Sequence, residues 1–202
     1  MTLPAYRHPT TPCDGSPVKS RPRLVTLALV APLLLTACGS SDQGSDADAS
    51  TAPTGSVEMT TTPPPWPAPT DDVAARVAAA GLDLGPMGTA EHYHPRLEIV
   101  VAGTPVPVPS NIGVDPSTGA MSALHTHEAD GTIHIEADTV GEVFTLGQLF
   151  VQWGVPLTRT QIGGVRAEAG ETVTLTSNGT PVTGDPGDLR LEPDQEIVLS
   201  IP

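Results

Sequence analysis

The chain has 202 residues, of which 23 are acidic and nine are basic, so its formal net charge is −14 at pH 7 with neutral histidines. A strongly acidic surface repels nucleic acid, so a nucleic-acid partner is not expected. The length suits a single folded domain preceded by a targeting segment.

Residues 1–37 have the pattern of a bacterial lipoprotein signal peptide. Three basic residues between positions 19 and 23 precede an apolar run over 24–35, which is shorter than a membrane-spanning helix needs. The run ends in Leu-Thr-Ala-Cys at 35–38, which resembles a lipobox. The resemblance implies that Cys38 becomes the first mature residue and carries diacylglyceryl and palmitate chains, which anchor the protein to the extracytoplasmic face of the cell membrane. An ordinary secretory peptide or an N-terminal membrane anchor is the alternative.

Cleavage before Cys38 leaves five arginines, no lysine and 22 acidic residues, a formal charge of −17. The other cysteine, Cys13, lies in the leader, so the mature chain lacks the thiols for a disulfide or a thiolate metal site. Residues 38–70 are rich in Ser, Asp, Thr and Pro and predict a disordered tether. Trp66, among prolines, is expected to be solvent-exposed; recognition by a proline-motif partner is the alternative.

Residues 71–202 predict a single β-dominated α+β domain, with one or two helices packed on a small mixed or antiparallel sheet. Apolar or alternating runs predict strands at 97–101, 121–127, 132–136, 171–176, 181–183 and 196–201, and the prolines in 106–109 suit an edge strand or a loop. Tight turns are expected at Gly103 and at Asn178-Gly179.

Two segments predict helices, and each is followed by a glycine that suits a helix end. The first covers 71–80, with Thr70 as its N-cap. The second covers 144–153, where Thr145 and Gln148 have capping-box spacing and apolar residues recur three or four positions apart.

Most of the histidines are concentrated in one region. Five of the six lie between residues 92 and 134, namely His92, His94, His125, His127 and His134. In extended chain, each His-x-His pair places both imidazoles on one sheet face. Neutral imidazole is the commonest protein ligand for copper and zinc, so the region predicts a transition-metal site.

A hairpin sharpens this prediction. If 128–131 form a four-residue loop, His127 faces Thr132 and His125 faces His134. One step further, Ala123 faces Glu136. Alternation then places the imidazoles on one face of the hairpin and Leu124, Ile133 and Ile135 on the core face.

The remaining ligands are less constrained by the sequence. Glu136, Glu91 and Glu98 are candidate carboxylates, either as direct ligands or as partners that fix an imidazole tautomer. Met121 lies on the imidazole face by parity, which leaves Cu(I) open, whereas calcium and magnesium are not expected. Whether His92 and His94 join the hairpin depends on long-range pairing that the sequence does not fix.

Three blocks resemble a family of exported or membrane-anchored prokaryotic proteins of uncharacterised activity. The shared motifs are H-x-H at 92–94, H-T-H-[DE]-x-x-G-x-I-H-I-E at 125–136 and F-T-L-G-Q-x-F-x-x-W-G at 144–154. The resemblance covers residues 90–202 and implies a shared domain without assigning a function. The hairpin also resembles a cupin site, but Gly131 and Thr132 stand where a cupin requires its glutamate.

These patterns predict a lipid-anchored protein that binds copper or zinc at the cell surface for storage, delivery or sensing. A metal-dependent enzyme with an open histidine site is the first alternative, disfavoured because no general base, nucleophile motif or substrate loop is recognisable. A non-metal protein-interaction module, a hydrogen-bonded structural cluster and a pH-responsive surface are the others. The sequence identifies no protein partner.

Overall fold

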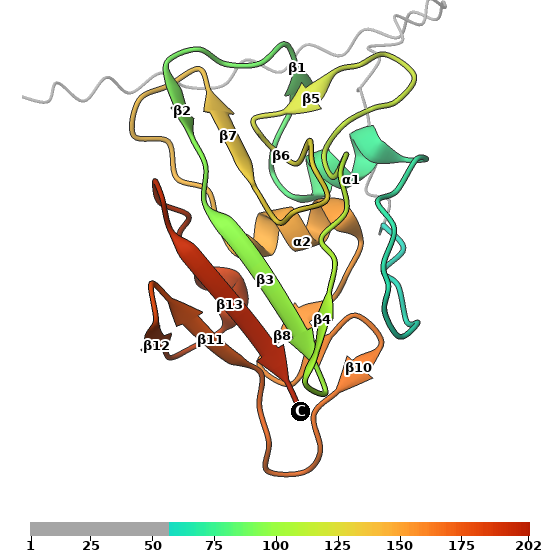
Figure 1. Cartoon of the computed structure of the whole chain (residues 1–202). Coiled ribbons are helices and arrows are strands. Elements are labelled where there is room, and N and C mark those ends of the chain that lie inside the picture. The colour runs from blue at the N-terminus through green and yellow to red at the C-terminus, as the bar shows by residue number, and fades with distance from the viewer. Residues whose placement is uncertain (1–56) are drawn as a thin grey trace, which may run out of the picture. The chain divides into compact units, whose positions relative to one another are not determined.

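A computed structural model describes residues 57–202 (Figure 1). Over this range the chain forms two α-helices, one 3-10 helix and 13 short strands arranged in four sheets. The predicted β-dominated α+β class is thereby confirmed. The predicted signal peptide 1–37, the lipid attachment at Cys38 and the first part of the predicted tether lie outside the described residues. No helix within 57–202 has the length and apolar character needed to cross a membrane.

The largest sheet has five strands in the order β12-β11-β13-β3-β4. They are β3 (Arg96–Val101), β4 (Thr104–Val106), β11 (Thr174–Ser177), β12 (Thr180–Val182) and β13 (Glu196–Ile201). β3 and β13 pair in parallel, and the other pairs of this sheet are antiparallel. Both hairpin turns use two consecutive residues with positive φ, Ala102-Gly103 and Asn178-Gly179, as type I′ turns require. The two turns predicted from the sequence are confirmed.

A second sheet, in the order β2-β7-β6, carries histidines on all three of its strands. It consists of β2 (Glu91–Tyr93), β6 (Leu124–His125) and β7 (His134–Ala137), paired antiparallel. β2 leads into β3 through only two residues, so one stretch of chain serves both sheets (Figure 1). The two smaller sheets are β1 (Leu84–Gly85) with β5 (Met121–Ser122), and β8 (Leu157–Thr158) with β9 (Gln161–Ile162) and β10 (Val165–Arg166).

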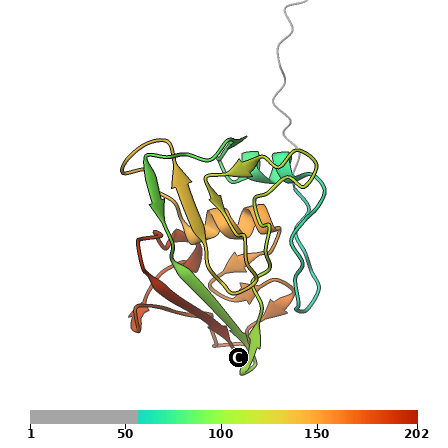
Figure 2. The ribbon, with the colours of Figure 1, turned by 45° about the horizontal axis from the view of Figure 1, so that its top comes forward.

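The longer helix, α2 (Leu146–Trp153), begins and ends as its sequence predicts. The Thr145 hydroxyl accepts a hydrogen bond from the Gln148 amide, and the Gln148 side chain accepts one from the Thr145 amide, which completes a capping box. Gly154 follows with φ 74°, the left-handed conformation that closes a helix. α2 packs against β6 and against the 3-10 turn η1 (Pro186–Asp188) (Figure 2).

The shorter helix, α1 (Val73–Ala79), differs from its prediction at the N-terminus. Asp72 takes the N-cap position with φ 53° and makes no side-chain cap, so the predicted capping by Thr70 is wrong. Packing holds this helix instead, because Val73 and Val77 are both buried. A helix of two turns depends on such docking, since it is not stable alone in water.

The core lies between α2 and the two larger sheets. Leu124, Ile133 and Ile135 are fully buried and form the side of the core that belongs to the histidine-bearing sheet, as alternation predicts. The five-stranded sheet contributes Leu97 and Ile99 from β3, together with buried residues of β13. The histidine-bearing sheet is therefore fixed by its apolar face, which leaves its other face for chemistry.

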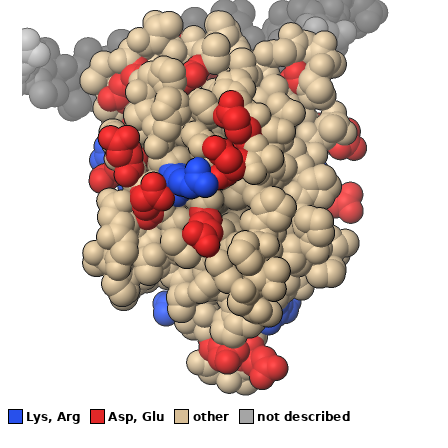
Figure 3. Space-filling model, viewed as in Figure 1, with Lys and Arg blue, Asp and Glu red and all other residues tan. Residues whose placement is uncertain are grey.

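The surface is acidic. Residues 57–202 contain 19 acidic side chains and five basic ones, all arginine. Figure 3 shows carboxylates spread over the face seen in Figure 1 with few basic groups between them. Such a field attracts cations without selecting among them.

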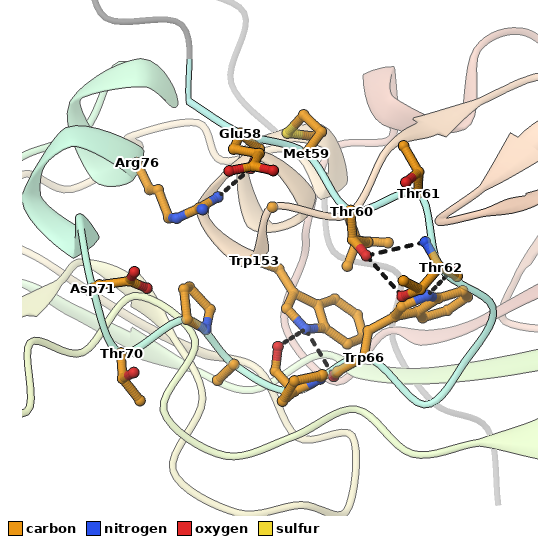
Figure 4. Close-up of a pocket in the computed structure, with 15 residues that line it drawn as sticks. Glu58, Met59, Thr60, Thr61, Thr62, Trp66, Thr70, Asp71, Arg76 and Trp153 are labelled. Atoms are coloured by element: carbon orange, nitrogen blue, oxygen red, sulfur yellow. Dashed lines mark hydrogen bonds between the residues drawn. The ribbon is translucent and has the colours of Figure 1, made fainter.

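Residues 57–70, which we call the N-terminal strap, pack against the domain (Figure 4). Trp66 is only 2% exposed. Its indole Nε1 donates a hydrogen bond to the Thr62 carbonyl at 2.9 Å, and its ring meets that of Trp153 edge-on with centroids 6.0 Å apart. The Trp153 indole in turn donates to the carbonyls of Trp66 and Pro67.

The strap corrects two predictions: the tether does not extend to residue 70, and Trp66 is not exposed. The strap is held because it packs on a distant part of the chain at Gly163 and Gly164. A Cβ at Gly163 would collide with the Trp66 ring, and the Gly164 amide donates a hydrogen bond to the Thr62 carbonyl at 2.9 Å. The five prolines between 63 and 69 also stiffen the segment, which lowers the conformational entropy lost on docking.

Candidate metal centre

Strand register brings both His-x-His pairs to one place. His125 pairs with His134 across β6 and β7, as the sequence predicts. On the other side of β7, His92 pairs with Glu136. The structure thereby answers the question that the sequence left open, because β2 lies beside β7, and His92 of β2 and His94 just after it join His134 of the hairpin.

The five imidazoles form a continuous series, which we call the imidazole row. Neighbouring ring centroids are 4.6 Å apart for His92 and His94, 4.5 Å for His94 and His134, 4.7 Å for His134 and His127, and 4.6 Å for His127 and His125. Each of these four contacts is edge-on. The rings of His125 and His134, which face each other across the hairpin, also stack, with their centroids 5.5 Å apart.

The two ends of the imidazole row differ in burial, although His127, which adjoins the buried end, is itself not buried. The side chain of His92 is 58% exposed, that of His134 is 14% exposed, and His125 at the far end is fully buried. Glu136 is also buried, and its Oε1 lies 3.3 Å from His92 Nε2. A carboxylate in such a position is costly to keep charged unless a cation or hydrogen-bond donors compensate it.

The buried end of the row is arranged as a ligand. His125 Nδ1 donates a hydrogen bond to the Ser122 carbonyl at 2.8 Å; because that carbonyl can only accept, Nε2 keeps its lone pair. Burial lowers the pKa of His125 to about 4, so this imidazole is neutral at neutral pH. Its Nε2 lies 3.0 Å from His127 Nε2. A carbonyl that fixes the tautomer from behind is the usual support of a metal-bound histidine.

His134 occupies the middle of the row and has one unpartnered nitrogen. Its Nε2 lies 3.2 Å from Glu128 Oε2, whereas its Nδ1 is buried and has no hydrogen-bond partner among residues 57–202. Next to it, burial lowers the pKa of His94, and repulsion from the imidazoles of His134 and His92 lowers it further. The neutral, ligand-competent form of His94 is therefore favoured.

Two overlapping sets of side chains could hold a metal ion. The buried group comprises His125, His127, His134 and Glu136, and the outer group comprises His92, His94 and His134. Within each group the ligand atoms lie within 4.8 Å of one another. Neutral imidazoles with one carboxylate and no thiolate suit Cu(II) or Zn(II).

The nitrogen atoms within each His-x-His pair lie at hydrogen-bonding distance from one another. The two Nε2 atoms are 2.9 Å apart in the first pair and 3.0 Å apart in the second. With metal–nitrogen bonds of about 2.0–2.1 Å, ligands at a right angle are about 2.9 Å apart and tetrahedral ligands about 3.4 Å apart. The observed spacing is that of a hydrogen bond between the two rings, and it is also compatible with adjacent corners of a square-planar or tetragonal centre.

The loop between the two hairpin strands differs from its prediction. Thr132 pairs with Arg96 of β3, and not with His127. The Gly131 carbonyl accepts a hydrogen bond from a β3 amide at 2.8 Å. Because β3 holds the loop, β6 ends two residues before His127, and this imidazole reaches the site from the loop.

The structure places the other candidate metal ligands in different parts of the domain. Glu91 and Glu98 belong to neither group, and Glu98 lies exposed on β3 in the five-stranded sheet. Met121 lines a hollow of about 220 Å³ together with Glu136. Both residues therefore border the same space, but among residues 57–202 only the carboxylate of Glu136 joins histidines in a group that could hold a metal.

Two partners of the imidazoles are missing from the sequence analysis. One is Glu128, whose carboxylate meets His134; its position directly after the His-Thr-His motif is the signal that identifies it. The other is the Ser122 carbonyl behind His125. A backbone carbonyl leaves no signal in the sequence, because any residue at that position supplies one.

A separate hollow of about 450 Å³ lies between the strap and the end of α2 (Figure 4). Its lining includes Thr60, Trp66 and Trp153 but no histidine. The Arg76 guanidinium beside it donates a hydrogen bond to the Glu58 carbonyl at 2.8 Å. These contacts hold the strap to the domain and assemble no set of metal ligands.

Comparisons of the chain with protein-family models, with curated proteins and with solved structures found no match. The chemistry of the centre is therefore inferred from its own atoms. These are five adjoining imidazoles, one buried carboxylate among them and a second carboxylate at the rim.

Proposed function

We propose that this protein binds a transition-metal ion, Cu(II) before Zn(II), in the buried group formed by His125, His127, His134 and Glu136. One observation carries the proposal. His125 is fully buried, its Nδ1 is tied to a backbone carbonyl, and its Nε2 faces the Nε2 of His127 at 3.0 Å. A neutral imidazole fixed in this way presents its lone pair to a shared point.

Charge balance supports a divalent ion. Three neutral imidazoles and the Glu136 carboxylate would leave a bound divalent ion with a net charge of +1. Glu136 is buried at 8% exposure, and the imidazole of His92 lies 3.3 Å from its carboxylate. A metal would therefore relieve the cost of the buried carboxylate.

The ligand set supports copper ahead of zinc. Both metals accept imidazole and carboxylate, but the near-right-angle spacing of the nitrogen pairs suits a tetragonal ion better than a tetrahedral one. Four protein ligands make a closed site, which favours storage, delivery or sensing over catalysis. With the lipid anchor proposed at Cys38, this metal handling would take place at the extracytoplasmic face of the cell membrane.

Metal titration of the full-length protein, purified in detergent and stripped with a chelator, tests the proposal. We expect one tightly bound Cu(II) per chain by calorimetry and elemental analysis, with nitrogen hyperfine splitting in the electron paramagnetic resonance spectrum. The double variant His125→Ala/His127→Ala should lose this binding, and Glu98→Ala should retain it, because Glu98 lies exposed outside the site. Absence of tight binding to the unaltered protein would leave a structural or protein-interaction role for the histidines.

A further inference from the structure

We infer that His92 and His94 form a capture position, from which the metal ion passes through His134 into the buried group. This inference rests on the proposed function and adds the route by which the site is filled. It assigns to the outer group a transient role in uptake, distinct from that of a second storage site.

The outer group and the buried group share one candidate ligand. His134 belongs to both the outer and the buried group. Its ring lies 4.5 Å from that of His94 and 4.7 Å from that of His127, edge-on in both cases. An ion that moves from one group to the other can therefore keep His134 while it exchanges its remaining ligands.

The two ends of the imidazole row differ in exposure, although His127 within the row is not buried. A hydrated ion can reach His92, whose side chain is 58% exposed, but it has no direct access to His125, which is fully buried. Stripping the whole hydration shell in one step is very costly, because a bare ion in a low-dielectric interior loses its solvation. The imidazole row replaces water by nitrogen one ligand at a time.

Two carboxylates lie along the imidazole row. Glu136 belongs to the buried group and also lies 3.3 Å from the Nε2 of His92 in the outer group. Glu128 lies 3.2 Å from the Nε2 of the shared His134. Carboxylates thus stand beside the start and the middle of the row, so the ion remains compensated along the way.

The hollow that Glu136 shares with Met121 offers a competing approach to the buried group. Its lining includes Asp83, Asp138 and Glu142, which would also attract a cation, but no histidine. The imidazole row is the better candidate because its members are ligands in contact with one another over the whole distance. The two approaches differ in the rates that they predict for one variant of the outer group: uptake along the imidazole row predicts slower binding, and uptake through the hollow predicts unchanged rates.

A capture position has a distinctive kinetic signature. Because it lies on the path in both directions, its loss slows association and dissociation by the same factor and leaves Kd unchanged. A direct ligand of the final site would instead raise Kd, and a second storage site would lower the stoichiometry. Replacing His94, whose neutral form is favoured, leaves the net charge unchanged, so electrostatic steering does not confuse the comparison.

The experiment is stopped-flow mixing of Cu(II) with the full-length protein in detergent, followed by ligand-field absorbance, and chelator competition for the reverse rate. For His94→Ala, which leaves the contact between His92 and Glu136 in place, we expect both rate constants to fall by the same factor of about tenfold or more, within the one to three decades over which association rates vary among mutants of one interface. Stoichiometry and Kd should remain those of the unaltered protein. Glu98→Ala is the control and should change neither rate.

Three results overturn the inference. Unchanged rates would assign uptake to another approach, through the hollow beside Met121 or directly at His127, which is not buried. A raised Kd would make His94 a direct ligand of the final site, and a fall from two ions to one would make the outer group a storage site. Failure of the unaltered protein to bind Cu(II) is a different result, because it removes the proposed function itself.

Discussion

His92 lies directly opposite Glu136 in the pairing of β2 with β7, and its Nε2 is 3.3 Å from the carboxylate. This pair connects two segments that are 44 residues apart and joins the exposed end of the imidazole row to the buried group. Glu136 therefore belongs to the buried candidate group and also contacts the exposed end of the imidazole row.

Replacement of Glu136 by glutamine tests this role. Glu136→Gln preserves shape but removes the negative charge, so Cu(II) affinity should fall by about 10- to 100-fold or more, the range found when groups supporting a metal site are altered. Isothermal titration calorimetry measures the change. Glu142→Gln is the matched control, because Glu142 is exposed and belongs to neither group. Equal effects of the two variants would mean that long-range charge alone matters.

Metal binding should stabilise the fold. A ligand that binds only the folded state at about 100 times its Kd adds about 2.7 kcal/mol to the free energy of unfolding. We expect thermal unfolding of the chelator-treated protein to move to higher temperature when Cu(II) is added. The His125→Ala/His127→Ala variant should show no such shift, and a shift retained by that variant would place the bound metal elsewhere.

The N-terminal strap should contribute strongly to stability. Trp66→Ala removes a fully docked indole, and losses of about 3–5 kcal/mol are typical when a buried aromatic residue becomes alanine. Trp66→Phe should cost less, because it keeps most of the apolar contact with Trp153 but loses the hydrogen bond to Thr62. Urea unfolding measures both values. Metal affinity should be unchanged, since no strap residue belongs to the metal groups; a loss below about 1 kcal/mol would contradict the docking.

Gly131 and Gly141 form a matched pair for testing the loop. Their φ angles are similar, 89° and 81°, but a Cβ at Gly131 would collide with the Leu97 carbonyl, whereas nothing lies within 4 Å of one at Gly141. Gly141→Ala should cost about 1 kcal/mol from backbone strain alone. Gly131→Ala should cost more and should weaken Cu(II) binding, because the displaced loop carries His127. Equal losses of stability in urea unfolding would show that β3 does not hold the loop.

Local signals predicted part of the site correctly. The pairing of His125 with His134 follows from alternation within one hairpin, where an error of one residue would expose Ile133 and Ile135 to water. The capping box at Thr145 likewise depends on residues three positions apart. Such features are determined by neighbours in the sequence, so the sequence is sufficient to find them.

Features that depend on distant segments were not predictable in this way. The partner of His92 is set by the pairing of β2 with β7, and the burial of Trp66 is set by the backbone at Gly163. Thr132 pairs with Arg96 of β3 in place of the local partner that hairpin geometry suggests. In each case tertiary contact outweighs the local preference, and no single-segment pattern carries the information.

The parallel pairing of β3 with β13 joins residues 100 positions apart, from Arg96 with Glu196 to Val101 with Ile201. The contacts between His125 and His134 span only nine positions. Contacts of short range form first during folding, because closing a long loop costs more entropy. The hairpin that carries His125, His127 and His134 can therefore form early. At that stage β2 is not yet fixed, because its chain continues into β3 and β3 has not yet paired with β13. Under the proposed function, a metal ion present at that stage would meet His125, His127 and His134 before the proposed capture position exists. The order of folding and loading would then decide whether uptake uses the imidazole row.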